Sequence, residues 1–414
     1  MTQAMASSGQ QAEDKINPRI FLLALGMFAL GTDANVVSGV LPVIARDIGV
    51  AEGLAGQLVT AFSLTYGLGA PFFAALTGRI APNRVLIGSL GLFGLANIAS
   101  AISPTFPLLL LTRVLAGCFA ASYAPLAYSV GVSLAPPAKR GQALALVVVG
   151  LTVATALGSP LGTYIGEHFG WRMSFVMVAA LAAVAFLVLL LRGLPRTTTP
   201  SALSLQARLA PIGQPRVILA LLPSLVWNLG IYTSYTYIAP LLQQNLHIME
   251  ISGLLVAFGV GIVCGNFSGG RLADRFGPNR LLIVALIVLA IIQALLSLAT
   301  ATFVGALLIL FIWGVTGSML FIPQQHRLLS IAPEHANVIL ALNNSAFYLG
   351  IAGGAALGGV ALRTLPITQL NWIGVVAALL ALVFLGLSIL LNGRPAPKGE
   401  NAIEEEKDGV LLPE

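Results

Sequence analysis

Charged side chains are scarce in this chain: Asp, Glu, Lys and Arg together make up 9% of its 414 residues. Soluble globular domains have about 25%, so the composition excludes that class. Hydrophobic residues make up 57%, which predicts an integral membrane protein. The net charge of +6 does not indicate nucleic-acid binding, because the basic residues lie in short loops between apolar segments.

Cysteine and the usual catalytic motifs are also rare or absent. Cys118 and Cys264 lie inside apolar segments, which favours packing roles and excludes a disulfide framework or a metal site. The chain has no G-x-x-x-x-G-K-[ST] phosphate loop, so ATP is not expected to drive it. We expect no metal, no cofactor and no enzymatic activity. The four histidines lie near loops without metal-ligand spacing: His168, His247, His326 and His335.

Long apolar runs divide the rest of the chain. A helix needs about 20 apolar residues to cross a bilayer, and twelve such runs are present. They predict an all-α membrane protein of two six-helix bundles. The runs are 20–45, 54–77, 85–103, 106–134, 141–165, 171–191, 216–242, 251–271, 281–300, 302–325, 336–362 and 369–391.

Polar segments flank and separate the two bundles. The predicted division is an N-terminal tail 1–18, a bundle 19–191, a linker 192–215, a bundle 216–391 and a tail 392–414, the last expected to be disordered. Of the 21 Lys and Arg, 17 fall on the side of the termini and three, Arg46, Arg172 and Arg363, on the other. Because cytoplasmic loops are enriched in Lys and Arg, we expect both termini in the cytoplasm.

Asp33 and Arg113 are the charged residues that this division leaves deep inside apolar spans. A charge at the bilayer centre costs at least about 2.5–3.5 kcal/mol on insertion scales. Intramembrane acids and bases therefore commonly mark transport paths or proton relays. A permanent structural ion pair is the alternative interpretation.

An internal repeat supports the two-bundle division. The segment from Ala74 to Leu86 aligns without gaps with the segment from Gly270 to Leu282, sharing a Pro-Asn-Arg sequence at 82–84 and 278–280. Each copy follows the second span of its half. Duplicated bundles are the usual build of secondary transporters, with the binding site near the midplane between them.

The second copy, Gly270-Arg271-Leu272-Ala273-Asp274-Arg275-Phe276-Gly277, resembles the loop signature of the major facilitator superfamily. The resemblance implies a latch on the cytoplasmic face made by Asp274 with Arg275 and Arg271. The first copy departs from the signature, because Gly78 stands at the place of the acid. A latch in that half cannot use the same carboxylate.

Two further segments resemble the drug:proton antiporter branch of that family, which includes arabinose- and chloramphenicol-efflux members. Leu109 to Ala121 is similar to its fourth-helix motif, with Arg113 as the basic residue and Ala116 in place of glutamine. Gly150 to Thr163 is similar to its fifth-helix motif, with Gly158 and Gly162 as a small-residue face and Pro160 as a kink. Such a helix favours either rocking of the bundles or tight packing alone.

The resemblance covers residues 19 to about 391 and implies a secondary transporter of the cytoplasmic (inner) membrane. We expect export of a small drug, sugar or nucleoside-like compound in exchange for protons, by a monomer in the lipid bilayer. Asp33 is then the proton carrier and Arg113 its partner. Helical spacing suggests weakly polar, aromatic substrate-lining positions: Asn35, Gln57, Thr60, Tyr123, Asn228, Tyr232, Tyr235, Asn344 and Tyr348.

Two alternatives stay open at this level. One is an uncoupled facilitator or importer of a small metabolite, in which Asp33 only binds substrate. The other is a membrane receptor or interaction protein that transports nothing, although the short tail and linker offer it little docking surface.

Overall fold

The structure is a computed structural model that describes residues 17–78, 80–136, 139–194 and 205–392. Twelve helical segments in this part of the chain are long and apolar enough to cross a membrane, which confirms the predicted all-helical fold class. Most of the two predicted tails, and residues 195–204 of the predicted linker, lie outside the described residues.

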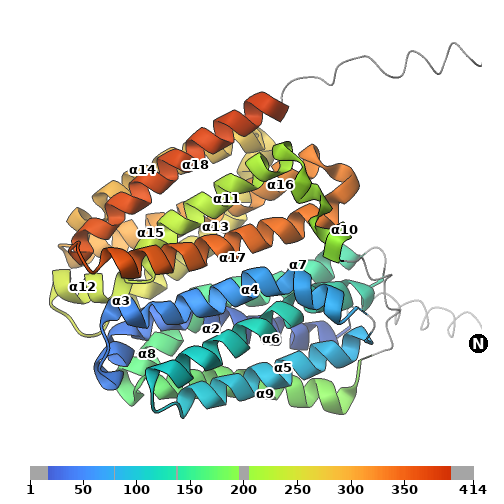
Figure 1. The fold of residues 1–414 in the computed structure, drawn as a ribbon, viewed down its shortest axis with the longest axis horizontal. Coiled ribbons are helices and arrows are strands. Elements are labelled where there is room, and N and C mark those ends of the chain that lie inside the picture. Colours follow the sequence, from blue (N-terminus) through green and yellow to red (C-terminus); the bar gives the residue numbers. More distant parts are fainter. Residues whose placement is uncertain (1–16, 79, 137–138, 195–204, 393–414) are drawn as a thin grey trace, which may run out of the picture.

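The first half runs from blue to green in Figure 1. Its elements are α2 (Arg19–Ile48), α3 (Glu52–Ala55), α4 (Gln57–Leu76), α5 (Pro82–Ala101), α6 (Phe106–Ser133), α7 (Arg140–Val153), the π-helical turn η2 (Ala154–Gly158), α8 (Ser159–Phe169) and α9 (Trp171–Arg192).

The second half begins after α10 (Leu205–Leu209) and the 3-10 turn η3 (Ala210–Gly213), which give the predicted linker some helical structure. Its elements are α11 (Pro215–Tyr235), α12 (Ile238–Leu246), α13 (Ser252–Phe276), α14 (Pro278–Ala299), α15 (Phe303–Met319), α16 (Phe321–Ile331), η4 (Pro333–His335), α17 (Ala336–Ala361), η5 (Ile367–Gln369) and α18 (Leu370–Asn392).

The sequence repeat corresponds to the same local structure in both halves. Pro82 and Pro278 are the first residues of α5 and α14, where the missing N–H and the fixed φ of proline suit the first helical turn. Gly277 separates α13 from α14 with φ 84°, a conformation that residues with a Cβ rarely adopt. The second copy thus forces a sharp reversal between two membrane-spanning helices.

The fifth span is not a continuous α-helix. It contains the π-helical turn η2 directly before Ser159 and Pro160, and such π turns occur frequently at functional sites. Its glycines pack on α2 of the same half: a Cβ at Gly158 would lie 2.0 Å from Thr32 Oγ1, and one at Gly162 would lie 2.5 Å from Val36 Cγ2. These two glycines therefore allow close packing inside the first half.

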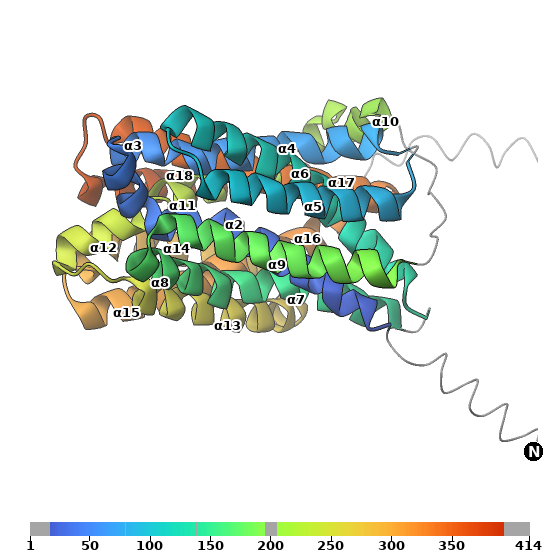
Figure 2. The same cartoon turned by 90° about the horizontal axis from the view of Figure 1, so that it is seen from below.

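The two halves lie side by side (Figure 1), and the long helices run between the same two ends in both views (Figures 1 and 2). We call the end that holds Arg19 and Asn392 the terminal end and the opposite one the far end. One hydrophobic core lies mainly in the first half, around Phe93 and Phe175. A second lies mainly in the second half, around Trp313 and Leu286.

Two helix pairs make most of the contact between the halves. Helix α17 lies along α4 (Figure 1), and α13 packs against η2 and α8. The second contact is backbone on backbone, because a Cβ at Gly259 would lie 2.4 Å from the Ala156 carbonyl oxygen and 2.6 Å from its Cα.

Gly259→Ala is therefore expected to open this contact. A Cβ at this position can be accommodated only if the halves separate there, and overpacking of this kind costs about 1–3 kcal/mol. We expect the equilibrium to move by about tenfold or more away from the conformation in which η2 and α13 touch. The measurement is chemical cross-linking of His168→Cys to Glu250→Cys, two far-end positions on opposite halves, in a background without Cys118 and Cys264.

Gly253→Ala is the matched control, because Gly253 lies on the same helix with open space at its Cβ position. Equal cross-linking yields for Gly259→Ala and Gly253→Ala would contradict the prediction.

Candidate functional site

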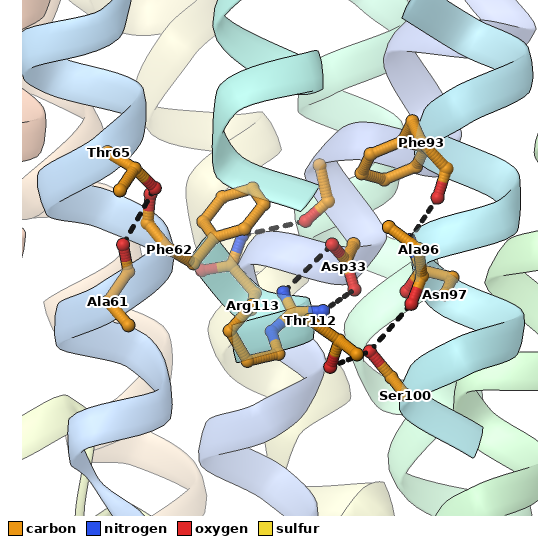
Figure 3. Close-up of polar contacts among 12 residues, drawn as sticks. Asp33, Ala61, Phe62, Thr65, Phe93, Ala96, Asn97, Ser100, Thr112 and Arg113 are labelled. Atoms are coloured by element: carbon orange, nitrogen blue, oxygen red, sulfur yellow. Dashed lines mark hydrogen bonds and ion pairs between the residues drawn. The ribbon is translucent and has the colours of Figure 1, made fainter. Parts of the chain in front are cut away.

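Asp33 and Arg113 form a fully buried ion pair inside the first half. Arg113 Nη1 donates to Asp33 Oδ1 at 2.9 Å and Nη2 donates to Oδ2 at 2.8 Å, so the pair is bidentate. Both residues are 0% exposed. Figure 3 shows the two side chains facing each other from α2 and α6. This geometry gives strong, directional charge-assisted hydrogen bonds.

Aromatic rings flank the guanidinium group on two sides. Its carbon lies 4.9 Å from the centroid of Phe62 on α4 and 5.2 Å from that of Phe175 on α9. Both distances are within the range of cation–π attraction. Arg113 Nε is buried and has no hydrogen-bond partner among the described residues, so Asp33 and the two rings are the principal stabilising neighbours of the guanidinium group.

The ion pair does not point at the other half, although its helix does contact that half. Asn35 follows Asp33 by two residues, which is about 200° around a helix, and its Oδ1 accepts a hydrogen bond from the Tyr232 hydroxyl at 3.3 Å. Helix α2 therefore presents Asp33 to the interior of the first half and Asn35 to the second half.

A tyrosine pair lies at the contact between α4 and α17. The rings of Tyr66 and Tyr348 stack with centroids 3.8 Å apart and planes 29° apart. Asn344, one helical turn before Tyr348 on α17, lies close to the Tyr66 hydroxyl. These residues, with Tyr232 and Asn35, form an aromatic, weakly polar and uncharged group between the halves, which we call the interface cluster.

Two other predicted lining residues also lie near this contact. Gln57 and Thr60, on α4, are half-buried. A Cβ at Gly359 of α17 would lie 2.7 Å from the Gln57 amide nitrogen. Thr60 Oγ1 is buried and has no hydrogen-bond partner in the part of the chain that the structure describes.

Of the remaining predicted lining residues, the structure places Tyr123 and Asn228 within the bundles and Tyr235 at the edge of the interface cluster. Tyr123 is 0% exposed within the first half, where its hydroxyl donates to the Leu23 carbonyl. Asn228 is 1% exposed and donates to the Ser224 carbonyl on its own helix. Tyr235 stacks on Phe258 in the second core, and its ring also meets that of Tyr232 edge-on at 5.6 Å. Helical spacing alone could not distinguish the interior of a bundle from the surface between the bundles.

The predicted latch residues lie at the terminal end of α13. The Asp274 side chain is 75% exposed, and its Oδ1 lies 4.0 Å from His326 Nδ1 of α16. The Arg275 guanidinium lies over the Phe276 ring. In the described part of the chain, no ion pair joins Asp274 to Arg271 or Arg275 in this conformation.

The far end, in contrast, is closed by polar contacts between the halves. Glu167 Oε1 at the end of α8 accepts the N–H of Ile251, the residue before α13, at 2.7 Å. His168 Nε2 lies 3.5 Å from Glu250 Oε1. The Tyr237 hydroxyl donates to the Ala355 carbonyl of its own half at 2.8 Å and lies 3.5 Å from the Gly53 carbonyl of the first half.

Arg327 corrects the expectation that Asp33 and Arg113 are the only deeply buried charges. The sequence places it in a loop beyond a span ending at 325, but α16 continues to Ile331 and Arg327 is 3% exposed. Its Nη2 donates to Ser388 Oγ of α18, and its Nη1 is buried with no hydrogen-bond partner within the described ranges. Hydropathy misplaces it because a single arginine in the last turns of a span looks like a loop residue.

Sequence reasoning also missed Phe62 and Tyr66. They are four residues apart, which places both on one face of the second span, and they connect the ion pair to the interface cluster. The i, i+4 aromatic spacing is visible in the sequence, but in a membrane helix it does not differ from ordinary lipid-facing or core spacing.

Comparisons with known proteins agree with this architecture. A family model described as Major Facilitator Superfamily matches residues 23–355. The inner membrane transport protein YdhP of Escherichia coli is 34% identical, covering 93% of this chain and 98% of that protein. A chloramphenicol resistance protein of Streptomyces lividans is 31% identical, covering 83% of this chain and 88% of that protein.

Among solved structures, a bacterial homolog of the human lysosomal transporter Spinster, in an inward-facing and occupied conformation, has the same fold. Its TM-score is 0.69 at 19% identity, with 91% of this chain and 98% of that chain covered. The family match and the twelve spans show that the chain is a multi-pass membrane transporter and not an enzyme, and that it belongs to the major facilitator superfamily.

Proposed function

We propose that this transporter exports a small organic compound in exchange for protons, by alternating access between its two halves. The observation that carries the proposal is the buried Asp33–Arg113 pair, which is bidentate and 0% exposed within the membrane-spanning part of the first half. Burying two charges is costly, and replacing a buried ion pair by apolar residues is often neutral or stabilising. A role in transport accounts for such a pair better than stability does.

A proton on Asp33 would change this pair more than any other event. The neutral carboxyl group could no longer balance the guanidinium charge or accept from both Nη atoms, so Arg113 would lose the bidentate pairing and would need a new arrangement. The pair is thus an element with two discrete states, which an alternating-access cycle requires. Proton release to one side and proton uptake from the other would bias the two conformations of the halves.

The interface cluster supports a neutral or mildly polar organic substrate. Tyr66, Tyr348 and Tyr232 offer ring faces and hydroxyls, and Asn35 and Asn344 offer amide groups, without a charged side chain among them. Such surfaces suit drug-, sugar- or nucleoside-like molecules. The names of two relatives, a chloramphenicol resistance protein and a probable sugar efflux transporter of Mannheimia succiniciproducens, favour export of compounds of this size.

Closure of the terminal end would complete the cycle. We propose that Asp274 pairs with Arg275 or Arg271, or with a neighbouring helix end, when that end closes and the far-end contacts of Glu167 and Tyr237 separate. Both termini would face the cytoplasm of an inner-membrane monomer. The proton gradient would be the energy source.

Transport in inside-out membrane vesicles tests the proposal. Vesicles containing the protein are energised, and uptake of labelled chloramphenicol, arabinose and uridine is measured with and without a protonophore. We expect uptake of at least one probe against its gradient, and its loss when the protonophore is added. Uptake that only equilibrates the probe and ignores the protonophore would favour the uncoupled facilitator, and no uptake of any probe would contradict the proposed substrate classes.

A further inference from the structure

Helix α4 contacts both the buried ion pair and the second half. Phe62 and Tyr66 lie one helical turn apart on this helix, and their ring centroids are 6.3 Å apart with planes 30° apart. Phe62 contacts the Arg113 guanidinium, and Tyr66 contacts Tyr348 of α17. The two rings therefore connect a charged site inside the first half to the contact between the halves.

The contact at the ion-pair end is tight. Phe62 is 2% exposed, and its ring centroid lies 4.9 Å from the guanidinium carbon of Arg113. Its backbone is also fixed against α6, because a Cβ at Gly117, four residues after Arg113, would lie 2.5 Å from the Phe62 carbonyl oxygen. A change in the position of Arg113 cannot leave the Phe62 ring unaffected.

The contact at the interface end is equally close. Tyr66 is 5% exposed and stacks on Tyr348 at 3.8 Å. One residue further, a Cβ at Gly67 would lie 3.2 Å from the Ser345 carbonyl oxygen of α17. Densely packed contacts of this kind switch between discrete arrangements and deform little, so a rotation of Tyr66 must change how α4 and α17 fit together.

We propose that Phe62 and Tyr66 are positioning residues that transmit the charge state of the Asp33–Arg113 pair to the contact between the two halves. The inference rests on the proposed proton coupling and adds its structural route. When Asp33 is ionised, its carboxylate holds the guanidinium between the Phe62 and Phe175 rings. When Asp33 is neutral, the cation is released from that position, the Phe62 ring follows it, and the Tyr66–Tyr348 stack is disturbed.

In the described part of the chain, Arg113 is the charged group that faces Asp33. The other polar side chains beside the pair are neutral: Thr112 on α6, and Asn97 and Ser100 on α5 (Figure 3). From α9 the neighbour is the Phe175 ring, and from α4 it is the Phe62 ring. A pH response of this site is therefore a response of the Asp33–Arg113 pair.

Phe175 provides a matched control within the same site. Its ring lies 5.2 Å from the same guanidinium carbon and is 0% exposed, like a true core residue. It belongs to α9, however, and its other ring contact is Trp171 on the same helix. Phe62→Leu and Phe175→Leu remove the same kind of cation–π contact from the same cation, but only the first interrupts the route to α17.

The test measures conformation without needing the substrate. Spin labels are attached to Ala81→Cys and Asn279→Cys, exposed terminal-end positions in opposite halves, with Cys118 and Cys264 replaced by alanine. Double electron–electron resonance measures the distance between the two labels on the full chain in lipid nanodiscs. Measurements at mildly acidic and mildly alkaline pH give the ratio of two conformations at each pH. The series comprises the wild type, Asp33→Asn, Phe62→Leu, Tyr66→Leu and Phe175→Leu.

Coupling between two sites usually changes an equilibrium by about 5- to 150-fold. We expect the wild-type ratio to change by about fivefold or more between the two pH values, and the change to disappear in Asp33→Asn. Phe62→Leu and Tyr66→Leu should reduce it to less than about twofold, whereas Phe175→Leu should keep it. If Phe62→Leu does not reconstitute as folded protein, Tyr66→Leu carries the same test from the other end of the route.

The possible failures are distinct. A wild type that does not respond to pH, or an Asp33→Asn variant that responds like the wild type, would contradict the proposed proton site. A pH response that depends on Asp33 but survives both Phe62→Leu and Tyr66→Leu, or is lost equally in Phe175→Leu, would overturn the proposed route through α4.

Discussion

Asp33→Asn is expected to abolish export against a concentration gradient while leaving exchange of substrate across the membrane in place. Asparagine keeps the shape of the side chain and one acceptor oxygen for Arg113, but it cannot take up or release a proton. The halves could still alternate around bound substrate, whereas the proton gradient could no longer drive them. The measurement compares energised uptake with counterflow of the same labelled probe in vesicles.

Asp47→Asn is the matched control for this experiment. Asp47 lies on the same helix, and its carboxylate binds Arg172 and Trp171 at the far end, where its side chain is 46% exposed. Exposed ion pairs contribute about 0–1 kcal/mol, so this variant should retain energised uptake. Energised uptake at the wild-type level in Asp33→Asn would remove Asp33 from the coupling mechanism, and equal loss of both activities would indicate a structural role.

The fold could be predicted from the sequence because its main determinant is the order and length of apolar runs along the chain. Apolar runs of membrane-crossing length predict the twelve spans, and the repeat around Pro82 and Pro278 predicts the two halves. The break in the seventh span was not predicted: the span, expected as 216–242, ends as α11 at Tyr235 and resumes as α12 at Ile238. Hydropathy is unchanged across such a break, so only the packing of both halves determines where it occurs.

The site could be predicted from the sequence only in part, for a related reason. A charge inside an apolar run is conspicuous, and Asp33 and Arg113 could be selected on that basis. The direction in which a side chain points depends on how helices distant in sequence pack. For this reason Tyr232 and Tyr348 proved to lie at the contact between the halves, whereas Tyr123 lies inside the first half. Arg327 was missed because its burial comes from α18, more than 50 residues later in the chain.

Arg113→Met is expected to destabilise the protein strongly. Methionine approximates the apolar stem of arginine, but it leaves the Asp33 carboxylate buried without a counter-charge, and breaking a buried pair in this way costs about 3–5 kcal/mol. The double variant Asp33→Asn/Arg113→Met should recover most of this loss, because no buried charge remains. Unfolding by denaturant in mixed micelles, followed by circular dichroism, measures the free energies.

Arg327→Met separates the effect of an unpaired carboxylate from that of a lost arginine. Arg327 is as deeply buried as Arg113, but its described partner is the Ser388 hydroxyl and not an acid. Removing its charge therefore leaves no opposite charge behind, and we expect a change within about 1 kcal/mol. Two results would contradict this: a double variant as unstable as Arg113→Met, or an Arg327→Met variant whose free energy of unfolding falls as much as that of Arg113→Met. In either case the packing of the arginine stem, and not the charge balance, would stabilise the first half. Asp33 would then be free to lose its charge without the conformational consequence that proton coupling requires.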